Sequence, residues 1–137
     1  WIEEYDLDGF RFDLMGLHDL ATMQEVESAV HNIDPEALIY GEGWTMGSTI
    51  TGEAQANQGN ISKITATNDA IGTIAVFNDA IRDGLKGSVF TTTSKGYISG
   101  NGAGTLTSVL FGMRGGTGVG PGWTVKKSMV LPLGCSA

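Results

Sequence analysis

The segment GFRFDL at residues 9–14 decides the fold prediction, because apolar and charged side chains alternate along it. Alternation with a period of two is typical of a β-strand with one buried face. The other face carries two opposite charges, Arg11 and Asp13, which lie two residues apart. Burying such charges is costly unless they pair or take part in chemistry. The segment therefore predicts a strand with a paired or functional Asp near its carboxyl end.

A helix is predicted after this strand. It is expected to begin at Asp19, a good N-cap, and to end at the pair Asp34-Pro35. Apolar residues recur along it at spacings of three and four and form one stripe: Leu20, Met23, Val26, Val30 and Ile33. Glu25 and Glu27 are expected to lie off that stripe.

A second strand is predicted for the apolar run ALIY at residues 37–40, which is consistent with burial on both faces. It finishes at the tetrapeptide GEGW, residues 41–44. The two strands and the helix between them have the size of one βαβ unit, about 30 residues or more. This alternation predicts an α/β chain with a parallel sheet or part of a barrel.

The remaining sequence predicts a long loop and then further elements. Residues 45–72 are rich in Gly, Thr, Asn, Ser and Gln, and we expect a loop with one short helical turn there. The later elements are expected to be a strand at 73–77, a helix at 80–85 capped by Asn78 or Asp79 and followed by Gly87, and a helix at 106–113 with Leu106, Val109, Leu110 and Met113 on one side. Residues 115–122 are rich in Gly and Pro, and 128–133 form a short apolar segment.

Length and composition limit the possible functions. The 137 residues can build one ordinary core, but a (β/α)8 barrel needs about 250 residues. Eight basic against fifteen acidic residues give a net charge of −7, which argues against nucleic acid or an anionic membrane as partner. The single cysteine, Cys135, excludes an internal disulfide and a cysteine-only zinc site. No signal peptide pattern and no apolar stretch of about 18 residues is present.

Asp13 and Glu42 are the candidate catalytic residues. Both lie at carboxyl ends of predicted parallel strands, where ligand sites of α/β folds are built. Two carboxylates on adjacent strand ends can perform glycoside chemistry, one as nucleophile and one as general acid/base. A helix cap or a loop hydrogen bond is the commoner role for such a carboxylate. The flanking Gly41 and Gly43 favour the catalytic alternative, because they allow a ligand to approach the backbone.

Three motifs in order resemble one enzyme family. DGFRFDLMG at residues 8–16 resembles the nucleophile strand of type I pullulanases, in the α-amylase superfamily of glycoside hydrolases, and GEGW at 41–44 resembles their acid/base strand. FNDAIRDGLKGSVF at 77–90 resembles a further pullulanase segment. Gly16-Leu17 stand where α-amylases usually carry a Lys-His pair, which is pullulanase-like. The resemblance covers residues 1–130.

The resemblance implies a fold and a set of roles. The chain would be a partial (β/α)8 TIM barrel of about strands four to six. Asp13 would be the nucleophile and Glu42 the general acid/base of a retaining hydrolase that cleaves α-1,6-glucosidic links in pullulan, starch or glycogen. Arg11 would position Asp13, and Trp44 would line the sugar cleft. No cofactor or metal is predicted for this chain, although a full-length parent could bind calcium, and the expected partner is an α-glucan.

Two other classes of function stay open. One is another superfamily member, such as an isoamylase, a glycogen-debranching enzyme or a branching enzyme. The other is a non-catalytic glucan-binding fragment, in which Trp44 and the acidic cleft hold the sugar. Asn78, Asp79, Arg82 and Asp83 match the third family motif, and we expect caps and surface ion pairs from them rather than direct substrate contact.

The family's other two site motifs are missing. Pullulanases also use an Asn-His motif on an earlier strand and a His-Asp motif on a later one. The pair His18-Asp19 lies at the start of the predicted helix, so we interpret Asp19 as its cap and His18 as a turn or rim residue. Residues 131–137 are interpreted as a tail without family meaning, produced by a frameshift near Leu131. Because the barrel cannot close, we expect little or no activity from this polypeptide alone.

Overall fold

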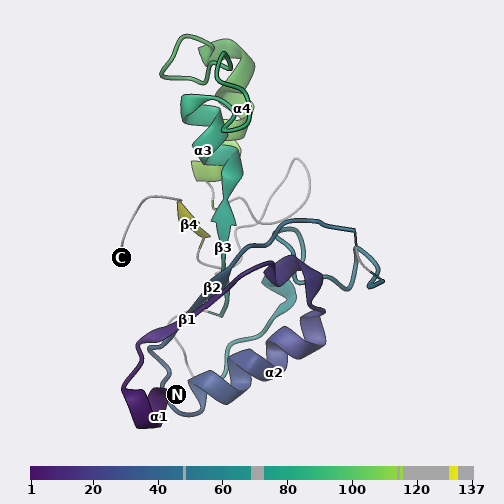
Figure 1. Cartoon of the computed structure of the whole chain (residues 1–137), viewed down its shortest axis with the longest axis vertical. Coiled ribbons are helices and arrows are strands. Elements are labelled where there is room, and N and C mark those ends of the chain that lie inside the picture. Colours follow the sequence, from purple (N-terminus) through teal and green to yellow (C-terminus); the bar gives the residue numbers. More distant parts are fainter. Residues whose placement is uncertain (48, 69–72, 114, 116–129, 133–137) are drawn as a thin grey trace. The chain divides into compact units, whose positions relative to one another are not determined.

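The computed structural model describes residues 1–47, 49–68, 73–113, 115 and 130–132, the last three without their side chains (Figure 1). The described residues form two compact units, of which the first contains Trp1–Val76 and the second begins at Phe77. The first unit contains α1 (Ile2–Tyr5), β1 (Gly9–Phe12), the 3-10 helix η1 (Met15–Leu17), α2 (Leu20–His31), β2 (Leu38–Gly41), the 3-10 helix η2 (Ile61–Lys63) and the start of β3 (Ala75–Asn78). The second contains the end of β3, α3 (Asp79–Lys86), α4 (Gly102–Met113) and β4 (Val130–Pro132).

Parallel strands form the sheet, as predicted. The strand order is β1-β2-β3-β4. β1 pairs with β2 in parallel from Gly9↔Leu38 to Phe12↔Gly41, and β2 pairs with β3 in parallel through Tyr40↔Ala75 and Gly41↔Val76. Three parallel strands that alternate with helices confirm the α/β class.

The first strand is shorter than its alternating pattern. β1 ends at Phe12, and Leu14 has φ 48° and ψ 36°, in the left-handed region. A strand cannot continue through that conformation. Asp13 and Leu14 therefore belong to the turn that leads into η1, and the predicted extent to residue 14 is wrong by two residues.

Helix α2 begins as predicted but ends earlier. Asp19 caps it by accepting a hydrogen bond from the Thr22 N–H at 2.6 Å. The last helical residue is His31, so Ile33 lies outside the helix, and 52% of it is exposed. The apolar stripe therefore does not extend to Ile33. Glu27 was expected to lie off the stripe, but it is 0% exposed, so that expectation is wrong. Its burial is made possible by a set of hydrogen bonds that is described below.

The core of the first unit combines α2, the sheet and the long loop. Its largest fully buried apolar side chains are Met15, Met23, Ile39, Ile61, Ile74 and Val76. The described part of the predicted loop 45–72 contains one short helical turn, η2, as expected. The buried Ile61 of that turn fixes the loop against the rest of the unit.

Two helices pack closely in the second unit. Asn78 caps α3, as predicted, by accepting a hydrogen bond from the Ile81 N–H at 3.2 Å, and its amide also donates to the Gly112 carbonyl of α4 at 3.0 Å. A side chain at Gly112 would collide with Ile81, so the glycine allows the helices to approach. Helix α4 begins at Gly102, four residues before its predicted start. Its first turn is closed by the Thr105 N–H and hydroxyl, which both donate to the Asn101 carbonyl, at 3.1 and 2.8 Å.

Part of the C-terminal prediction lies outside the described residues. β4 includes Leu131 and Pro132, and residues 116–129 and 133–137 are not described. The division into a family segment at 1–130 and a tail at 131–137 stays a prediction.

Candidate active site

The site is built at the carboxyl ends of β1 and β2. The last ladder pair, Phe12↔Gly41, places the next residue of each strand, Asp13 and Glu42, on neighbouring positions. Parallel pairing explains this, since the carboxyl ends of such strands lie at the same edge of a sheet. The structure thus brings together the two carboxylates that the sequence predicted.

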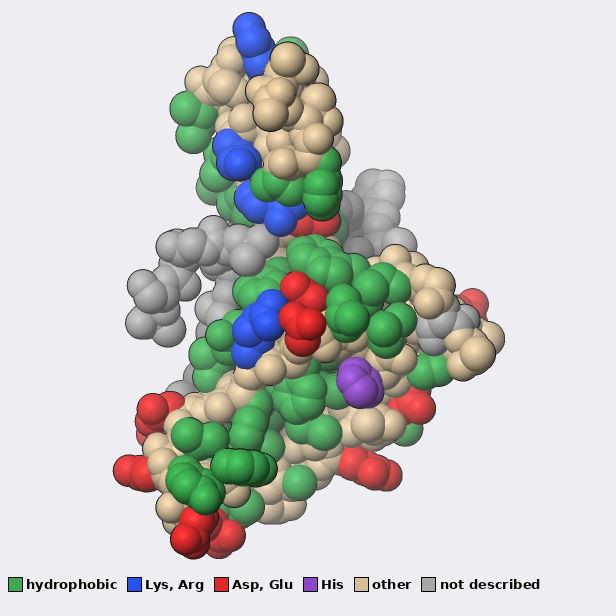
Figure 2. All heavy atoms as spheres, viewed as in Figure 1, with side chains coloured by type: hydrophobic (Ala, Val, Ile, Leu, Met, Phe, Trp, Pro, Cys, Tyr) green, Lys and Arg blue, Asp and Glu red, His purple; other side chains and the backbone are tan. Residues whose placement is uncertain are grey.

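Arg11 joins the two carboxylates. Its Nη1 lies 3.0 Å from Asp13 Oδ1, and its Nη2 lies 3.2 Å from Glu42 Oε1. The guanidinium fork has a fixed planar geometry, so it sets the separation of the groups that it binds. Figure 2 shows basic and acidic side chains in contact on the surface, bordered by hydrophobic side chains. Arg11, Asp13 and Glu42 are named below as the strand-end cluster.

Glu42 is held more firmly than Asp13. Its N–H donates to the Phe12 carbonyl at 3.0 Å, its carbonyl accepts from the Gly16 N–H at 2.9 Å, and its Oε2 accepts from the Leu14 N–H at 3.0 Å. The side chain of Glu42 is 20% exposed, whereas that of Asp13 is 70% exposed. One carboxylate is therefore sheltered and fixed, and the other faces solvent.

Leu14 and Gly16 are site residues that the sequence reasoning missed. Leu14 has a left-handed backbone conformation, which is unusual for a residue with a side chain. In this conformation its N–H donates a hydrogen bond to the Glu42 carboxylate. At Gly16 a Cβ atom would collide with the Trp44 carbonyl oxygen, so this turn can lie against residues 42–44 only with glycine. The glycine of the DLMG motif was the available signal, because a glycine after a strand often marks a close backbone approach.

The predicted sugar-contacting residue, Trp44, lies two residues after Glu42 and is half-buried. Its backbone faces Gly16. The role in stacking on a sugar stays a prediction.

A second carboxylate cluster lies on α2, and the sequence reasoning did not predict it. Glu27 Oε1 lies 2.9 Å from His31 Nδ1 and accepts from the Thr67 N–H at 2.8 Å. Its Oε2 accepts from the Thr67 hydroxyl at 2.7 Å and from the Gln24 amide at 3.1 Å. His31 Nε2 lies 3.0 Å from the Ala37 carbonyl oxygen, so both ring nitrogens have oxygen partners. We name Gln24, Glu27, His31 and Thr67 the helix cluster.

Hydrogen bonds decide the charge state of Glu27. Burial alone would raise the pKa of Glu27, but the hydrogen bonds from His31 and Thr67 lower that pKa below its ordinary value. The spacing of Glu27 and His31, four residues apart on one helix, was the sequence signal for this pair.

Two further classes of site are absent from the described residues. The part of the chain that the structure describes holds no group of three or more His, Cys, Asp and Glu side chains placed for a metal ion. Among the same residues, no helix combines the length and hydrophobicity that crossing a membrane requires.

Comparison with known proteins gives one consistent result. Pullulanase of Bacillus subtilis (strain 168) is 34% identical over 118 residues, which are 86% of this chain and 15% of that protein. The crystal structure of apo pullulanase from Paenibacillus barengoltzii superposes with a TM-score of 0.80 at 38% identity, over 96% of this chain and 19% of that one. This chain matches a segment of the pullulanases.

A third pullulanase agrees with this match. The enzyme from Anoxybacillus sp. LM18-11, solved in complex with maltotetraose, superposes with a TM-score of 0.72 at 37% identity, over 84% of this chain. The chain spans about a sixth of the length of these pullulanases, from 15% to 19%. No family model matches the sequence. The predicted resemblance to pullulanases is confirmed.

Proposed function

We propose that this chain is the part of a pullulanase-type catalytic (β/α)8 barrel, about strands four to six, that supplies the two catalytic carboxylates. The observation that carries the proposal is Arg11, which contacts both Asp13 and Glu42 at the ends of adjacent parallel strands. Glycoside hydrolysis generally uses two carboxylates that flank the scissile bond, and neighbouring strand ends can supply such a pair. The match to pullulanases supports the same reaction class.

The geometry supports a separate role for each carboxylate. Asp13, which is open to solvent, would attack the anomeric carbon and form a glycosyl-enzyme intermediate. Glu42, sheltered and fixed by the turn at residues 14–16, would protonate the leaving oxygen and then take a proton from water. Neighbouring strands lie about 4.8 Å apart, close to the 5–5.5 Å that retaining enzymes need between carboxylates. Arg11 would hold both groups in register.

An α-glucan is the proposed substrate and partner. The Anoxybacillus pullulanase was solved with bound maltotetraose, an α-glucan oligomer. We propose that the parent of this chain cleaves α-1,6 links, with Trp44 in the cleft beside Glu42. The chain has about half of the roughly 250 residues that a closed barrel needs. We therefore expect little or no release of reducing sugar from pullulan by the 137-residue chain itself.

A chimera tests the catalytic roles. In Bacillus subtilis pullulanase, the segment that matches this chain would be replaced by residues 1–130. We expect the chimera to hydrolyse pullulan and to lose about 10³-fold or more in kcat after Asp13→Asn or Glu42→Gln. Glu25→Gln, at an exposed position of α2, is the matched control and should leave kcat unchanged. A Glu42→Gln chimera as active as its parent would contradict the proposal.

Binding without cleavage is the second candidate function. Leu14 and Leu17 favour it, since 44% and 36% of these side chains are exposed next to the strand-end cluster, where they offer an apolar surface to a sugar ring. Affinity electrophoresis of the 137-residue chain in gels with and without soluble starch tests it. Retardation that disappears with Trp44→Ala would support binding, and equal mobility in both gels would exclude it.

A further inference from the structure

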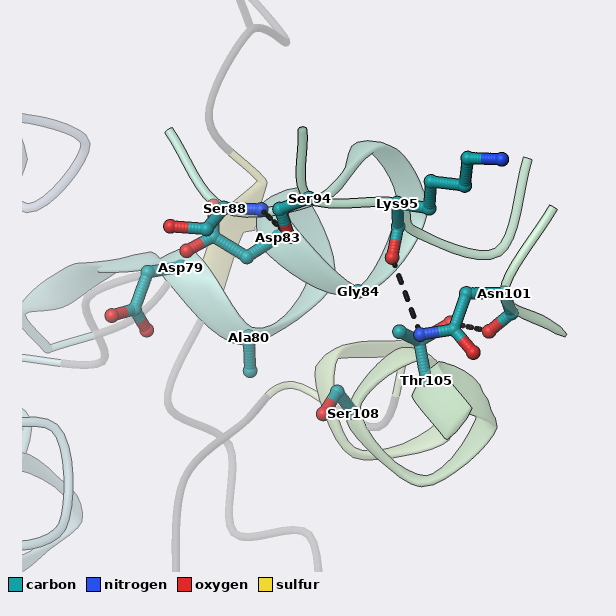
Figure 3. A pocket seen from close by; sticks show the side chains of 10 residues that line it. All are labelled: Asp79, Ala80, Asp83, Gly84, Ser88, Ser94, Lys95, Asn101, Thr105 and Ser108. Carbon is teal, nitrogen blue, oxygen red and sulfur yellow. Dashed lines mark hydrogen bonds between the residues drawn. The ribbon is translucent and has the colours of Figure 1, made fainter. Parts of the chain in front are cut away.

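Two groups of polar side chains outside the strand-end cluster differ in their burial. Figure 3 shows the first group, which lines a hollow between α3 and α4 in the second unit. Apart from Gly84, the residues of that lining are exposed or half-buried, among them Asp79 and Ser108. The second group is the helix cluster of the first unit, in which Glu27 and His31 are both buried. Because a buried charge is costly unless it is paired and hydrogen-bonded, the partners of these two residues indicate what the helix cluster does.

Both ring nitrogens of His31 face oxygen atoms that accept hydrogen bonds. Nε2 lies 3.0 Å from the Ala37 carbonyl oxygen, which cannot donate, so Nε2 carries a proton. Nδ1 lies 2.9 Å from Glu27 Oε1, and a hydrogen bond of that length also needs a proton between the two atoms. Burial acts to raise the pKa of Glu27, but the hydrogen bonds from His31 and Thr67 hold that pKa below its ordinary value, which places the proton on the imidazole. This arrangement fits an imidazolium ion that donates from both nitrogens.

Glu27 balances the charge of His31. The turn after α2 carries Asp34 and Glu36, and the Asp34 carboxylate accepts a hydrogen bond from the Glu36 N–H at 2.9 Å. On η2, Lys63 is exposed, and its Nζ donates to two oxygen atoms of the long loop at 2.9 and 3.3 Å. Within the part of the chain that the structure describes, Glu27 is the one ion-pair partner of His31. The proton in this pair is therefore governed by the two residues themselves.

Glu27 also holds the end of the long loop against α2. Its Oε1 accepts from the Thr67 N–H at 2.8 Å, and its Oε2 accepts from the Thr67 hydroxyl at 2.7 Å. One turn earlier on the helix, the Gln24 side chain accepts from the Thr65 N–H at 2.8 Å and donates to the Thr65 carbonyl at 3.0 Å. The Gln24 amide also donates to Glu27 Oε2 at 3.1 Å. Glu27 therefore connects the imidazole ring with the loop.

Loss of the shared proton changes the contacts of Glu27 on both sides. Without that proton, the lone pair of His31 Nδ1 would face a carboxylate oxygen, and neither atom could donate to the other. A buried carboxylate without its cationic partner is costly, so it would turn away from the ring. Because the same Oε1 atom accepts from His31 and from the Thr67 N–H, this movement would also break the bond to the loop. Histidine is the side chain whose charge ordinarily changes near neutral pH.

We propose that the proton shared by His31 and Glu27 acts as a pH-sensitive switch, which holds the loop segment 65–67 on α2 and releases it when the proton is lost at alkaline pH. The rest of the first unit stays folded, because the pairing of β1 with β2 and the Asp19 cap of α2 do not involve the helix cluster. The proposal does not depend on the roles of Asp13 and Glu42.

NMR of the 137-residue chain from about pH 5 to about pH 9 tests the proposal on the unmodified protein. Two-bond ¹H–¹⁵N spectra report which ring nitrogens of His31 carry protons, and we expect both to do so at the acid end. Hydrogen exchange of the Thr67 amide, corrected for the intrinsic effect of pH, reports the release of the loop segment. Its protection should fall about tenfold or more as His31 loses a proton, with one midpoint for both signals. The amide of the buried Ala56, which donates to the His18 carbonyl at 2.9 Å, should keep its protection.

Three variants separate the two histidines of the chain and the carboxylate. Glu27→Gln cannot form the ion pair, and His31→Gln has no ring proton to lose, so the pH-dependent change at Thr67 should disappear in both. His18→Gln removes the other histidine, which is exposed, and is the matched control. The midpoint and the change in protection at Thr67 should be the same in this control as in the parent.

Several results would overturn the proposal. They are a His31 Nδ1 without a proton at the acid end, a His31 ring that does not titrate below about pH 9, and a protection of Thr67 that is unchanged across the titration. Loss of protection at Ala56 together with Thr67 would also overturn it, because the whole unit would then unfold. So would a pH-dependent change at Thr67 that persists in Glu27→Gln or His31→Gln. If a variant does not fold, seen as lost amide dispersion, the measurement on the parent decides.

Discussion

The strand-end cluster and the helix cluster contain the same kinds of groups in opposite surroundings. Each pairs a carboxylate with a cationic or imidazole side chain at 2.9–3.2 Å. In the helix cluster the paired side chains are 2% and 0% exposed, whereas Arg11 and Asp13 are 43% and 70% exposed. Contact distance alone therefore does not distinguish a structural carboxylate from a candidate catalytic one.

Hydrogen-bond saturation makes the difference. Both oxygens of Glu27 accept bonds from the protein, and removing the group would leave the buried His31 and the half-buried Thr67 and Gln24 without this partner. Asp13 uses one oxygen on Arg11 and is 70% exposed, so a ligand can reach it. A saturated buried group stabilises the fold, and an exposed, partly engaged one remains available for a ligand.

The largest expected effect comes from breaking the helix cluster. Glu27→Ala takes the carboxylate partner from the buried His31 and the acceptor from the half-buried Thr67 donors, which should reduce the free energy of unfolding by about 3–5 kcal/mol. Asp13→Ala, which removes an exposed pair, should cost at most about 1 kcal/mol. Urea denaturation of the 137-residue chain measures both. Equal losses for the two variants would show that the buried helix cluster does not stabilise the fold more than the exposed strand-end cluster.

Gly16→Ala tests how far packing supports the strand-end cluster. The new methyl group would collide with the Trp44 carbonyl, and we expect a loss of about 1–3 kcal/mol, as for overpacking. Gly47→Ala is the matched control, since a Cβ atom there would meet nothing within 4 Å. If both substitutions have the same small effect on urea unfolding, the turn is not held against residues 42–44.

The pH dependence of stability tests whether Glu27 stabilises the fold through its charge. Because the pKa of Glu27 in the folded state lies below its ordinary value of 4.5, the ionised group stabilises the fold at pH values above 4.5. That contribution is lost as the pH falls through the lowered pKa. The difference in unfolding free energy between the parent and Glu27→Gln should therefore shrink on acidification below pH 4.5. A constant difference between pH 7 and pH 3 would show that Glu27 contributes through packing instead.

The smallest effect is expected at Leu14. Leu14→Gly removes the left-handed strain of about 1–2 kcal/mol but also makes the unfolded chain more flexible, at a cost of about 1 kcal/mol. The free energy of unfolding should change by less than about 1 kcal/mol, while the N–H donor to Glu42 is kept. Leu14→Pro removes that donor and forbids the positive φ, and should cost clearly more in the same urea titration.

Local sequence patterns predicted correctly those features that depend on a few neighbouring residues. Alternation gave β1, the Asp19 cap gave the start of α2, and Asn78 was identified correctly as one of two possible caps of α3. Errors lie at ends that depend on contacts. β1 stops at Phe12 because the next residues turn toward Glu42, and α4 begins at Gly102, directly after Asn101, a preferred N-cap residue that the sequence reasoning did not use.

The sequence by itself determined the α/β class, the parallel sheet, the pairing of Asp13 with Glu42 and the resemblance to pullulanases, because these depend on periodicity and on motifs of adjacent residues. Only the tertiary structure decided that Glu27 is buried and Asp13 is exposed. Thr67, which is 40 positions away, supplies hydrogen bonds that let Glu27 enter the core, and Arg11 reaches Glu42, 31 positions away, across a ladder that joins positions 29 apart. Such long-range contacts set the burial of a charge, and no local pattern encodes them.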